Sequence, residues 1–506
     1  MLNITLKSSV MSWVMRKRMH QINLFRKYPH DVQAELLFKI VETAKNTDFG
    51  KKHGFEKIKN YEQFKNQIPI NKYEDIHPYI ESIKKGNQNV LWPTKTKWFA
   101  KSSGTSGSKS KFIPITEESL KECHFKGGKD MLSIYCDNYP NTTVFNGKSL
   151  ILGGSHENSL NNNLKTGDLS AIIMENLPLW VTIHQTPSKK VALLNNFEKK
   201  VKEMARVSSK ENVTNIAGVP SWILVLLKYI LKENNESDLK NIWPNLELYM
   251  HGGVNFGPYK KEFKKIMPEK TNYLETYNAS EGFFGIQDQK NSAEMLLMLD
   301  YGIFYEFIPT KNFSEDNAIP IWETKKDIDY ALVISTNGGL WRYLIGDTIK
   351  FSSTEPYRFK ITGRITQFIN TFGEELIMDN ANKAITIACK KTNTSIKEYT
   401  VAPIFMQEKN KGGHEWLVEF ENKPKDLMFF KYILDDTLKA LNSDYEAKRY
   451  NDLVLNPPII HTAKKDLFYI WLKKQDKLGR QFKVPRLSNN RDIIESLLKL
   501  NNEPLK

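Results

Sequence analysis

The chain has little of what would stabilise a small secreted protein or carry a membrane span. Its 506 residues include only three cysteines, Cys123, Cys136 and Cys389, and no CxxC pair. This odd, scattered set supports neither a disulfide framework nor a cysteine-rich zinc site. The strongest apolar run, 222–231, is interrupted by Lys228 and is too short to span a bilayer. We therefore expect a cytoplasmic protein without a signal peptide or a membrane segment.

Two common catalytic and nucleotide-binding signatures are also missing. A P-loop needs GxxxxGK[ST] between a strand and a helix, and the only Gly-Lys-Ser run, 147–149, has Thr142 in place of the upstream glycine. We assign no Ser-His-Asp or Cys-His nucleophile. Any phosphate site in this chain therefore needs a loop of another kind.

The composition is that of a globular protein with a basic excess. Hydrophobic residues make up 40% of the chain, which excludes extensive disorder, and its length favours more than one domain. Lys and Arg number 73 against 58 Asp and Glu, a net charge of +15. Such an excess suits nucleic acid, an anionic membrane or small anionic substrates. Because the charges are spread widely, we interpret them as solvated helix faces.

The pattern of apolar residues predicts mixed helices and strands. The chain to about residue 45 is expected to be helical, and a polar, loop-rich stretch should follow as far as Trp98. Residues 112–115 look extended, and Thr116 before two acids is typical of a helix start. Strands are predicted at 330–335 and 340–343 around an Asn-Gly turn, and another turn at 362–364. These elements indicate an α/β architecture with more than one sheet.

One loop is rich in the groups that bind phosphate. Residues 101–111 read Lys-Ser-Ser-Gly-Thr-Ser-Gly-Ser-Lys-Ser-Lys. Glycines let backbone N–H groups converge on an oxyanion, hydroxyls add donors, and lysines neutralise phosphate charge. The loop predicts a triphosphate site, although a surface linker can have a similar composition.

Further motifs follow the loop in a fixed order. They are Trp-Pro-Asn at 243–245 leading to His-Gly-Gly at 251–253, Tyr-Asn-Ala-Ser-Glu at 277–281, Tyr-Leu-Ile-Gly-Asp at 343–347 and Gln-Phe-Lys-Val-Pro-Arg at 481–486. Together with the loop they resemble the adenylate-forming enzymes. Within that group the chain is similar to the GH3 family of acyl-acid amido synthetases, in a bacterial-type form. The resemblance covers about residues 98 to 487.

The resemblance implies an α/β fold in two parts. A large N-terminal adenylation domain, 1–362, would bind ATP and the acyl substrate, with mixed β-sheets flanked by helices and a β-barrel-like subdomain. A smaller, mobile α/β C-terminal domain would take up 363–506.

The resemblance also implies the site residues. Lys483 and Glu281 would be catalytic, with Glu281 as the Mg²⁺ ligand, and His251 would contact the acyl group. The expected ATP-binding residues are Ser102, Ser103, Gly104, Thr105, Ser106, Lys111, Gly252, Gly253, Tyr277, Ser280, Asp347 and Arg364.

These assignments make chemical sense, although each residue alone has a plainer interpretation. Tyr277 can stack on adenine, Glu281 offers the hard oxygen that Mg²⁺ prefers, and Asp347 can accept hydrogen bonds from both ribose hydroxyls. Taken singly, they would be a core aromatic, a surface acid and part of a turn. Their order in the chain and their occurrence together favour the assignment to a site.

The chain departs from the family pattern at two positions. Leu344 stands where the family has an arginine before the Gly-Asp pair, so it is open whether an arginine such as the adjacent Arg342 contacts the nucleotide there. Thr366 stands where many relatives have a hinge aspartate, which leaves the pivot open.

The expected reaction has two halves. A small carboxylic acid attacks the α-phosphate of Mg-ATP, and the acyl-adenylate is then attacked by an amine, by resemblance that of an amino acid. Such chemistry needs positioning and electrostatics from the protein and no covalent nucleophile. A coenzyme A ligase with a thiol acceptor and a nucleotide-binding regulator without turnover are the alternatives. We expect neither a nucleic-acid nor a membrane partner.

We predict that Lys483→Ala lowers the rate of adenylation about 10²- to 10³-fold, because a preorganised cation that stabilises the transition state is lost. ATP binding should stay nearly intact. Single-turnover adenylation and ATP titration would measure the two effects, and an unchanged rate would remove Lys483 from the mechanism.

Overall fold

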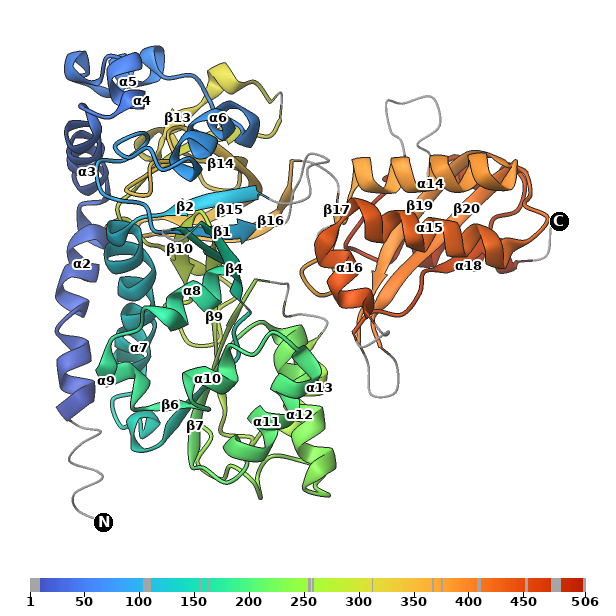
Figure 1. Cartoon of the computed structure of the whole chain (residues 1–506), viewed down its shortest axis with the longest axis horizontal. Helices are drawn as coiled ribbons and strands as arrows, with labels where there is room; N and C mark the ends of the chain where they lie inside the picture. The colour runs from blue at the N-terminus through green and yellow to red at the C-terminus, as the bar shows by residue number, and fades with distance from the viewer. Residues whose placement is uncertain are drawn as a thin grey trace. The chain divides into compact units, whose positions relative to one another are not determined.

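The computed structural model describes residues 10–102, 111–154, 156–161, 164–253, 256, 259–311, 313–365, 368–374, 376–406, 411–450, 454–474 and 484–503. The chain forms two compact units (Figure 1). The first comprises Met1–Ser102, Phe112–Phe256 and Phe263–Ile365, and the second Ser103–Lys111, Gly257–Glu262 and Thr366–Lys506. No helix among the described residues is long and apolar enough to cross a membrane. All three cysteines are free thiols.

The N-terminal segment is helical, as the sequence predicts, and its helices continue further than expected. They are α2 (Met19–Lys27), α3 (Pro29–Ala44), α4 (Asp48–Lys52), η1 (Phe55–Lys57), α5 (Tyr61–Gln67) and α6 (Tyr73–Lys84). The prediction of a loop-rich stretch before Trp98 was therefore wrong. The side chains of Thr47 and Asn60 cap α4 and α5 by accepting from backbone N–H groups. Phe49 and Phe64 are buried and anchor these short helices. The polar composition of the segment did not indicate the helices.

A twelve-stranded sheet forms the centre of the first unit. Its order is β13-β12-β14-β15-β16-β11-β10-β9-β8-β7-β3-β6. The strands, in chain order, are β3 (Lys148–Ile151), β6 (Gln185–Thr186), β7 (Val213–Ala217), β8 (Leu248–Gly252), β9 (Asn272–Ala279), β10 (Gly282–Ile286), β11 (Met295–Leu297), β12 (Ile303–Pro309), β13 (Ile319–Pro320), β14 (Asp329–Thr336), β15 (Tyr343–Thr354) and β16 (Tyr357–Arg364). β9 pairs in parallel with β8 and antiparallel with β10, so it joins a parallel half to an antiparallel half.

The antiparallel half belongs to the same twelve-stranded sheet, and the expected β-barrel-like subdomain stays a prediction. The predicted hairpin is present, with β14 covering 330–335, but β15 begins at Tyr343, so the expected strand at 340–343 was placed too early. Residues 362–364 were predicted as a turn and instead end β16, where Arg364 pairs with Asp347. A glycine at 363 is compatible with a strand at this point because the β15–β16 register shifts beside it.

A second, four-stranded sheet has the order β2-β1-β5-β4. Its strands are β1 (Trp98–Ser102), β2 (Lys111–Ile115), β4 (His156–Asn161) and β5 (Leu164–Gly167). β2 confirms the extended segment predicted before Thr116. The Thr116 hydroxyl accepts from Ser119 N at 3.0 Å, so the predicted helix cap is also confirmed.

Helices flank the two sheets of the first unit. They are η2 (Ser119–Phe125, π-type), α7 (Lys126–Asn138), η3 (Val144–Asn146), α8 (Leu169–Glu175), α9 (Leu179–Thr182), α10 (Lys189–Ala192), α11 (Phe197–Ser208), α12 (Pro220–Glu233), α13 (Lys260–Ile266), η5 (Glu315–Asn317) and η6 (Ile321–Glu323). Figure 1 shows α2 and α7 side by side, and Arg18 joins them by donating to the buried Asp130 of α7 at 3.0 Å.

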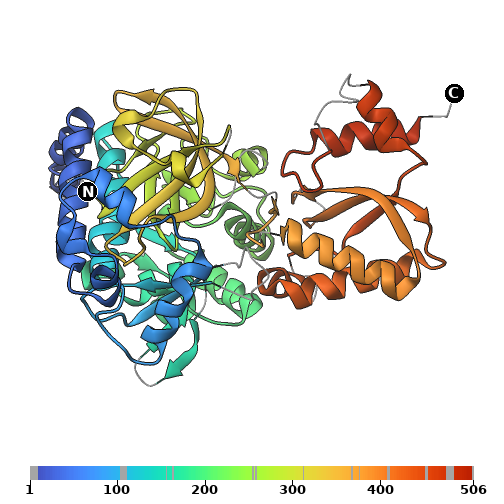
Figure 2. The same ribbon diagram turned by 90° about the horizontal axis from the view of Figure 1, so that it is seen from above.

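The second unit is α/β, as expected for the C-terminal part. A short β17 (Phe368–Ile369) and β18 (Leu376–Ile377) pair precedes a sheet of β19 (Ser395–Ile404), β20 (Gly413–Asn422) and β21 (Ile459–Thr462). The helices are α14 (Met378–Thr392), α15 (Leu427–Leu441), α16 (Ser443–Arg449), α17 (Leu467–Lys474) and α18 (Asp492–Asn502). Figure 2 shows the sheet between α14 with α15 and the red α17 with α18. The first compact unit ends at Ile365, and the expected division into domains after residue 362 stays a prediction.

A buried contact between Glu374 and His414 lies near the start of the second unit. Glu374 is fully buried and accepts from His414 Nε2 at 2.7 Å and from the backbone N–H groups of Thr371 and Phe372. Burial alone would raise the pKa of Glu374, but the hydrogen bond and charge of His414 outweigh it and lower the pKa to about 2. The carboxylate therefore stays ionised in the folded chain.

We predict that Glu374 stabilises the second unit above pH 4.5, its ordinary pKa, and that this contribution disappears as the pH falls towards 2. The lost free energy of unfolding is on the order of 3 kcal/mol. Amide hydrogen exchange of β19 and β20 between pH 5 and 3 would measure it. Glu374→Gln should reduce the pH dependence, whereas Glu421→Gln, at an exposed position of β20, should leave it unchanged. Equal slopes in both variants would contradict the prediction.

Candidate functional site

Three of the predicted site residues contact one another. Tyr277 lies near the end of β9, Asp347 in β15 and Arg364 at the end of β16. The Tyr277 hydroxyl donates to Asp347 Oδ2, and Arg364 Nε donates to Asp347 Oδ1. The β15–β16 register places Asp347 opposite Arg364, so the strand pairing itself brings the cation to the carboxylate. Residues separated by 70 positions in the sequence thus form one polar group.

The Tyr277 side chain is buried and is not freely accessible for stacking. Its ring packs against Phe284 at 4.7 Å and Phe359 at 6.2 Å between centroids. Burial, followed by the charge of Asp347, raises the pKa of Tyr277 well above its usual value, so its hydroxyl remains a donor. The stacking of Tyr277 on adenine stays a prediction.

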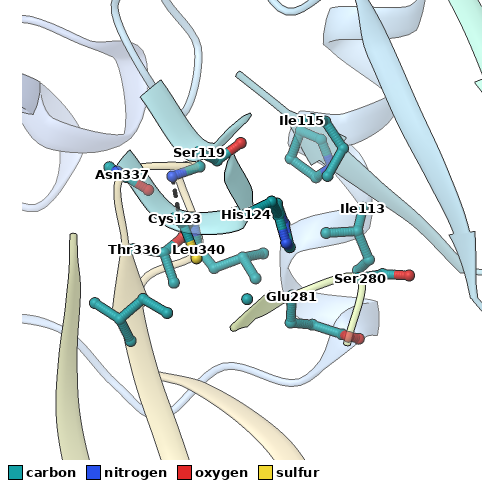
Figure 3. A pocket seen from close by; sticks show the side chains of 14 residues that line it. Ile113, Ile115, Ser119, Cys123, His124, Ser280, Glu281, Thr336, Asn337 and Leu340 are labelled. Carbon is teal, nitrogen blue, oxygen red and sulfur yellow. Dashed lines mark hydrogen bonds between the residues drawn. The ribbon is translucent and has the colours of Figure 1, made fainter. Parts of the chain in front are cut away.

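A small cavity brings further motifs together (Figure 3). One residue of its wall, Glu281, is near enough to Tyr277 for its charge to contribute to the raised pKa of Tyr277. The cavity wall contains Ser280 and Glu281 from the turn between β9 and β10, residues 113–115 of β2, and residues 336–338 after β14. β2 directly follows the predicted phosphate loop, and residues 336–338 precede the Gly-Asp motif. Segments from three parts of the sequence therefore meet at one cavity.

Five of the predicted site residues lie outside the part of the chain that the structure describes. Ser103, Gly104, Thr105, Ser106 and Lys483 fall outside the described residues, so their assigned roles stay predictions. Ser102 ends β1, and Lys111 begins β2.

The glycines at 252 and 253 have a local structural reason. A Cβ on Gly252 would come within 2.3 Å of Thr276 O in the neighbouring strand, and Gly253 has φ +82°. The chain can therefore turn tightly at the end of β8 beside β9. The His251 ring is buried and stacks on Phe256 at 4.1 Å, within a group of aromatic side chains. Its predicted contact with an acyl group stays a prediction.

Glycines occur at the same edge of three adjacent parallel strands. Gly153 and Gly154 follow β3, Gly218 follows β7, and Gly252 ends β8. Backbone hydrogen bonds from Leu152 N to Ala217 O and from Gly218 N to Met250 O keep these ends level. Ligands of open α/β sheets generally bind at the carboxyl ends of parallel strands, and these glycines lie at that edge.

Arg342 serves a structural purpose and is turned away from Asp347. Its guanidinium forms a buried pair with Glu306 at 2.8 Å and donates to the carbonyl oxygens of Lys65 and Ile68. Leu344 packs against an apolar cluster that includes Ile308, Ala331 and Val333. The arginine beside Asp347 is instead Arg364, supplied by the neighbouring strand.

His124 and Asn278 are site residues that the sequence interpretation missed. His124 lies in η2 on the cavity wall, and its Nδ1 is 3.1 Å from Asn278 Oδ1. Asn278 belongs to the Tyr-Asn-Ala-Ser-Glu motif, but no spacing rule connects a histidine of one helix to a strand 154 positions away. Only the fold reveals the contact.

Three domain models of one protein family match the chain. A GH3 family N-terminal domain model matches residues 18–272, a central domain model 296–364 and a C-terminal domain model 379–492. The chain belongs to the GH3 family. The resemblance inferred from its motifs is thereby confirmed, whereas its bacterial type stays a prediction.

Named relatives of this GH3 chain are amido synthetases. It is 22% identical to "Indole-3-acetic acid-amido synthetase GH3.4" of Arabidopsis thaliana, over 93% of this chain and 91% of that protein. It is 26% identical to "Jasmonoyl--L-amino acid synthetase JAR4" of Nicotiana attenuata, over 63% of this chain and 66% of that protein.

Solved structures share the fold of the GH3 chain. "GH3.15 acyl acid amido synthetase" matches with a TM-score of 0.58 and 17% identity, covering 93% of each chain. A 2-hydroxyisobutyryl-CoA ligase matches with a TM-score of 0.53 and 12% identity, covering 98% of this chain and 93% of that one. The expected α/β adenylate-forming fold, with a larger N-terminal and a smaller C-terminal part, is confirmed.

We predict that Glu306→Leu destabilises the first unit by about 3–5 kcal/mol, because Arg342 would be left buried without its counter-charge. Chemical denaturation of the full chain would measure the loss. The double variant with Arg342→Met should lose less than the sum of the two single variants, since neither charge remains. Additive losses would show that the pair is not coupled.

Proposed function

We propose that this GH3 chain adenylates a small carboxylic acid with ATP and transfers the acyl group to the amino group of an amino acid. The observation that carries the proposal is the convergence of Tyr277 and Arg364 on the Asp347 carboxylate. The motif of Tyr277 also supplies Ser280 and Glu281 to the wall of a cavity. The names of the relatives as amido synthetases support the acceptor class.

Asp347 is proposed to bind the ribose of ATP. Its carboxylate is partly accessible, with 15% of its side chain exposed, and is held by donors from two other strands. A carboxylate fixed in this way can accept from both ribose hydroxyls without losing much side-chain freedom. Arg364, at 13% exposure, brings positive charge to the same place and would favour a phosphate nearby.

Glu281 is proposed to hold Mg²⁺ with the phosphates. Mg²⁺ in nucleotide sites commonly takes one or two carboxylates and fills its remaining positions with phosphate oxygens and water. Glu281 fits this donor set, since its carboxylate supplies hard oxygen ligands and it lies beside Ser280 on the cavity wall. Among the residues that the structure describes, no group of three or more His, Cys, Asp and Glu side chains gathers into a metal cage. Bound Mg²⁺ would neutralise charge on the phosphates during displacement of pyrophosphate.

The acid is proposed to bind at the glycine-lined edge of β3, β7 and β8. This proposal rests on the general rule that ligands of open α/β sheets bind at the carboxyl ends of parallel strands. The glycines there are needed for packing, since a Cβ on Gly154 would come within 1.9 Å of Asp168 and one on Gly252 within 2.3 Å of Thr276 O. In the first half-reaction the chain holds the carboxylate and the α-phosphate in line. In the second it holds the acyl-adenylate for attack by the amine, and Lys483 would stabilise the charge that develops on the phosphate.

The test is pyrophosphate exchange. With Mg²⁺ and a panel of acids, acid-dependent exchange of labelled pyrophosphate into ATP is the expected result. Amino acids added to the same reaction should give an amide, identified by its mass. A thioester formed with coenzyme A would favour the ligase alternative. ATP binding without exchange across the panel would favour a nucleotide-binding regulator and overturn the proposal.

We predict that Asp347→Asn weakens ATP binding by about 10- to 100-fold, since hydrogen bonds to a charged group contribute about 1.5–3 kcal/mol. Isothermal titration with ATP would measure it. Asp329→Asn is the matched control, because Asp329 in β14 pairs with Lys350 at 2.9 Å on the exposed face of the same sheet. Equal affinities of the two variants would rule out a direct role for Asp347.

A further inference from the structure

The cavity beside Glu281 has the size of a water site. Its volume is about 10 Å³, near the smallest that holds one water molecule. An amino acid or an acyl group does not fit there. What the cavity could hold therefore depends on the polar atoms of its wall.

His124 is the buried titratable group on this wall. His124 is only 4% exposed, and its Nδ1 lies 3.1 Å from Asn278 Oδ1. An amide oxygen only accepts, so Nδ1 carries the ring proton and Nε2 keeps a lone pair. Burial lowers the pKa of His124 to about 4, partly offset by the bond to Asn278, which agrees with a neutral ring. The ring makes no second hydrogen bond to a residue that the structure describes.

Other polar groups on the wall are already committed. The Ser119 hydroxyl takes part in the helix cap with Thr116, and Cys123 Sγ accepts from Phe283 N at 3.2 Å. The Thr336 hydroxyl accepts from Gly338 N at 3.1 Å. Ser280, Glu281 and Asn337 also line the cavity, and Figure 3 shows them around the same cavity as His124.

We propose that His124 Nε2 accepts a hydrogen bond from a water molecule in this cavity, and that this water positions the Glu281 carboxylate for its divalent cation. His124 is thus a positioning residue, oriented by Asn278 of the same motif that supplies Glu281. The inference rests on the proposed role of Glu281. Partners that orient a metal ligand typically change metal affinity about 10- to 100-fold.

A general base for the amine is the competing role, and the structure disfavours it. A useful base has a pKa near the working pH, whereas that of His124 is about 4. The cavity also lacks room for the amine. Neither objection applies to a neutral His124 ring that accepts a hydrogen bond from water.

The experiment measures Mn²⁺ binding to the full chain by electron paramagnetic resonance, in the presence of a non-hydrolysable ATP analogue. His124→Leu should weaken Mn²⁺ binding about 10-fold, because the water loses its acceptor. His124→Gln should keep most of the affinity, since its amide oxygen can accept near the position of Nε2. The matched control is His30→Leu, which removes another histidine hydrogen bond, to Tyr357 at 3.0 Å, away from the cavity.

Unchanged Mn²⁺ affinity in His124→Leu would overturn the inference. So would an equal loss in His124→Gln, because the ring shape and not its acceptor would then matter. The proposed function is tested separately by pyrophosphate exchange in the wild-type chain. Absent exchange together with weaker Mn²⁺ binding in His124→Leu would refute the function and leave the positioning role standing. Wild-type protein that binds no Mn²⁺ with the analogue would refute both.

Discussion

The carboxylate of Asp347 is the group on which the candidate site depends. It accepts from Tyr277 of β9 and from Arg364 of β16, so it joins the strand where the parallel half of the sheet ends to the antiparallel hairpin. The β15–β16 register sets this geometry, because a slip of one residue would turn Asp347 to the opposite face. The antiparallel half therefore acts as a support for the edge that we propose binds the nucleotide.

A second charged pair keeps that support in place. Arg342 and Glu306 are both buried, and the guanidinium also holds the carbonyl oxygens of Lys65 and Ile68 between α5 and the sheet. A buried arginine with all these partners has no freedom to reach a substrate. The two arginines near the Gly-Asp motif thus differ in role. Arg342 stabilises the fold, and Arg364 contacts Asp347 of the candidate site.

The turn between β9 and β10 serves two purposes at once. Its motif supplies Tyr277 and Glu281 to the nucleotide side, and it supplies Asn278 to the buried His124 behind it. One short segment therefore connects the group that would bind the ribose to the group that would hold the cation.

The sequence by itself determined the family, the α/β class and the local elements with strong signals. The cap at Thr116, the strand before it and the helices up to residue 45 depend on neighbouring residues, so a local pattern suffices. Short helices such as α4 and α5 escaped because single buried aromatics anchor them against distant strands. The turn expected at 362–364 became strand because Asp347 and Arg364 pair across the hairpin. Only the tertiary structure decided which arginine meets Asp347 and that His124 reaches Asn278, since both contacts join side chains from separate elements whose approach no local spacing encodes.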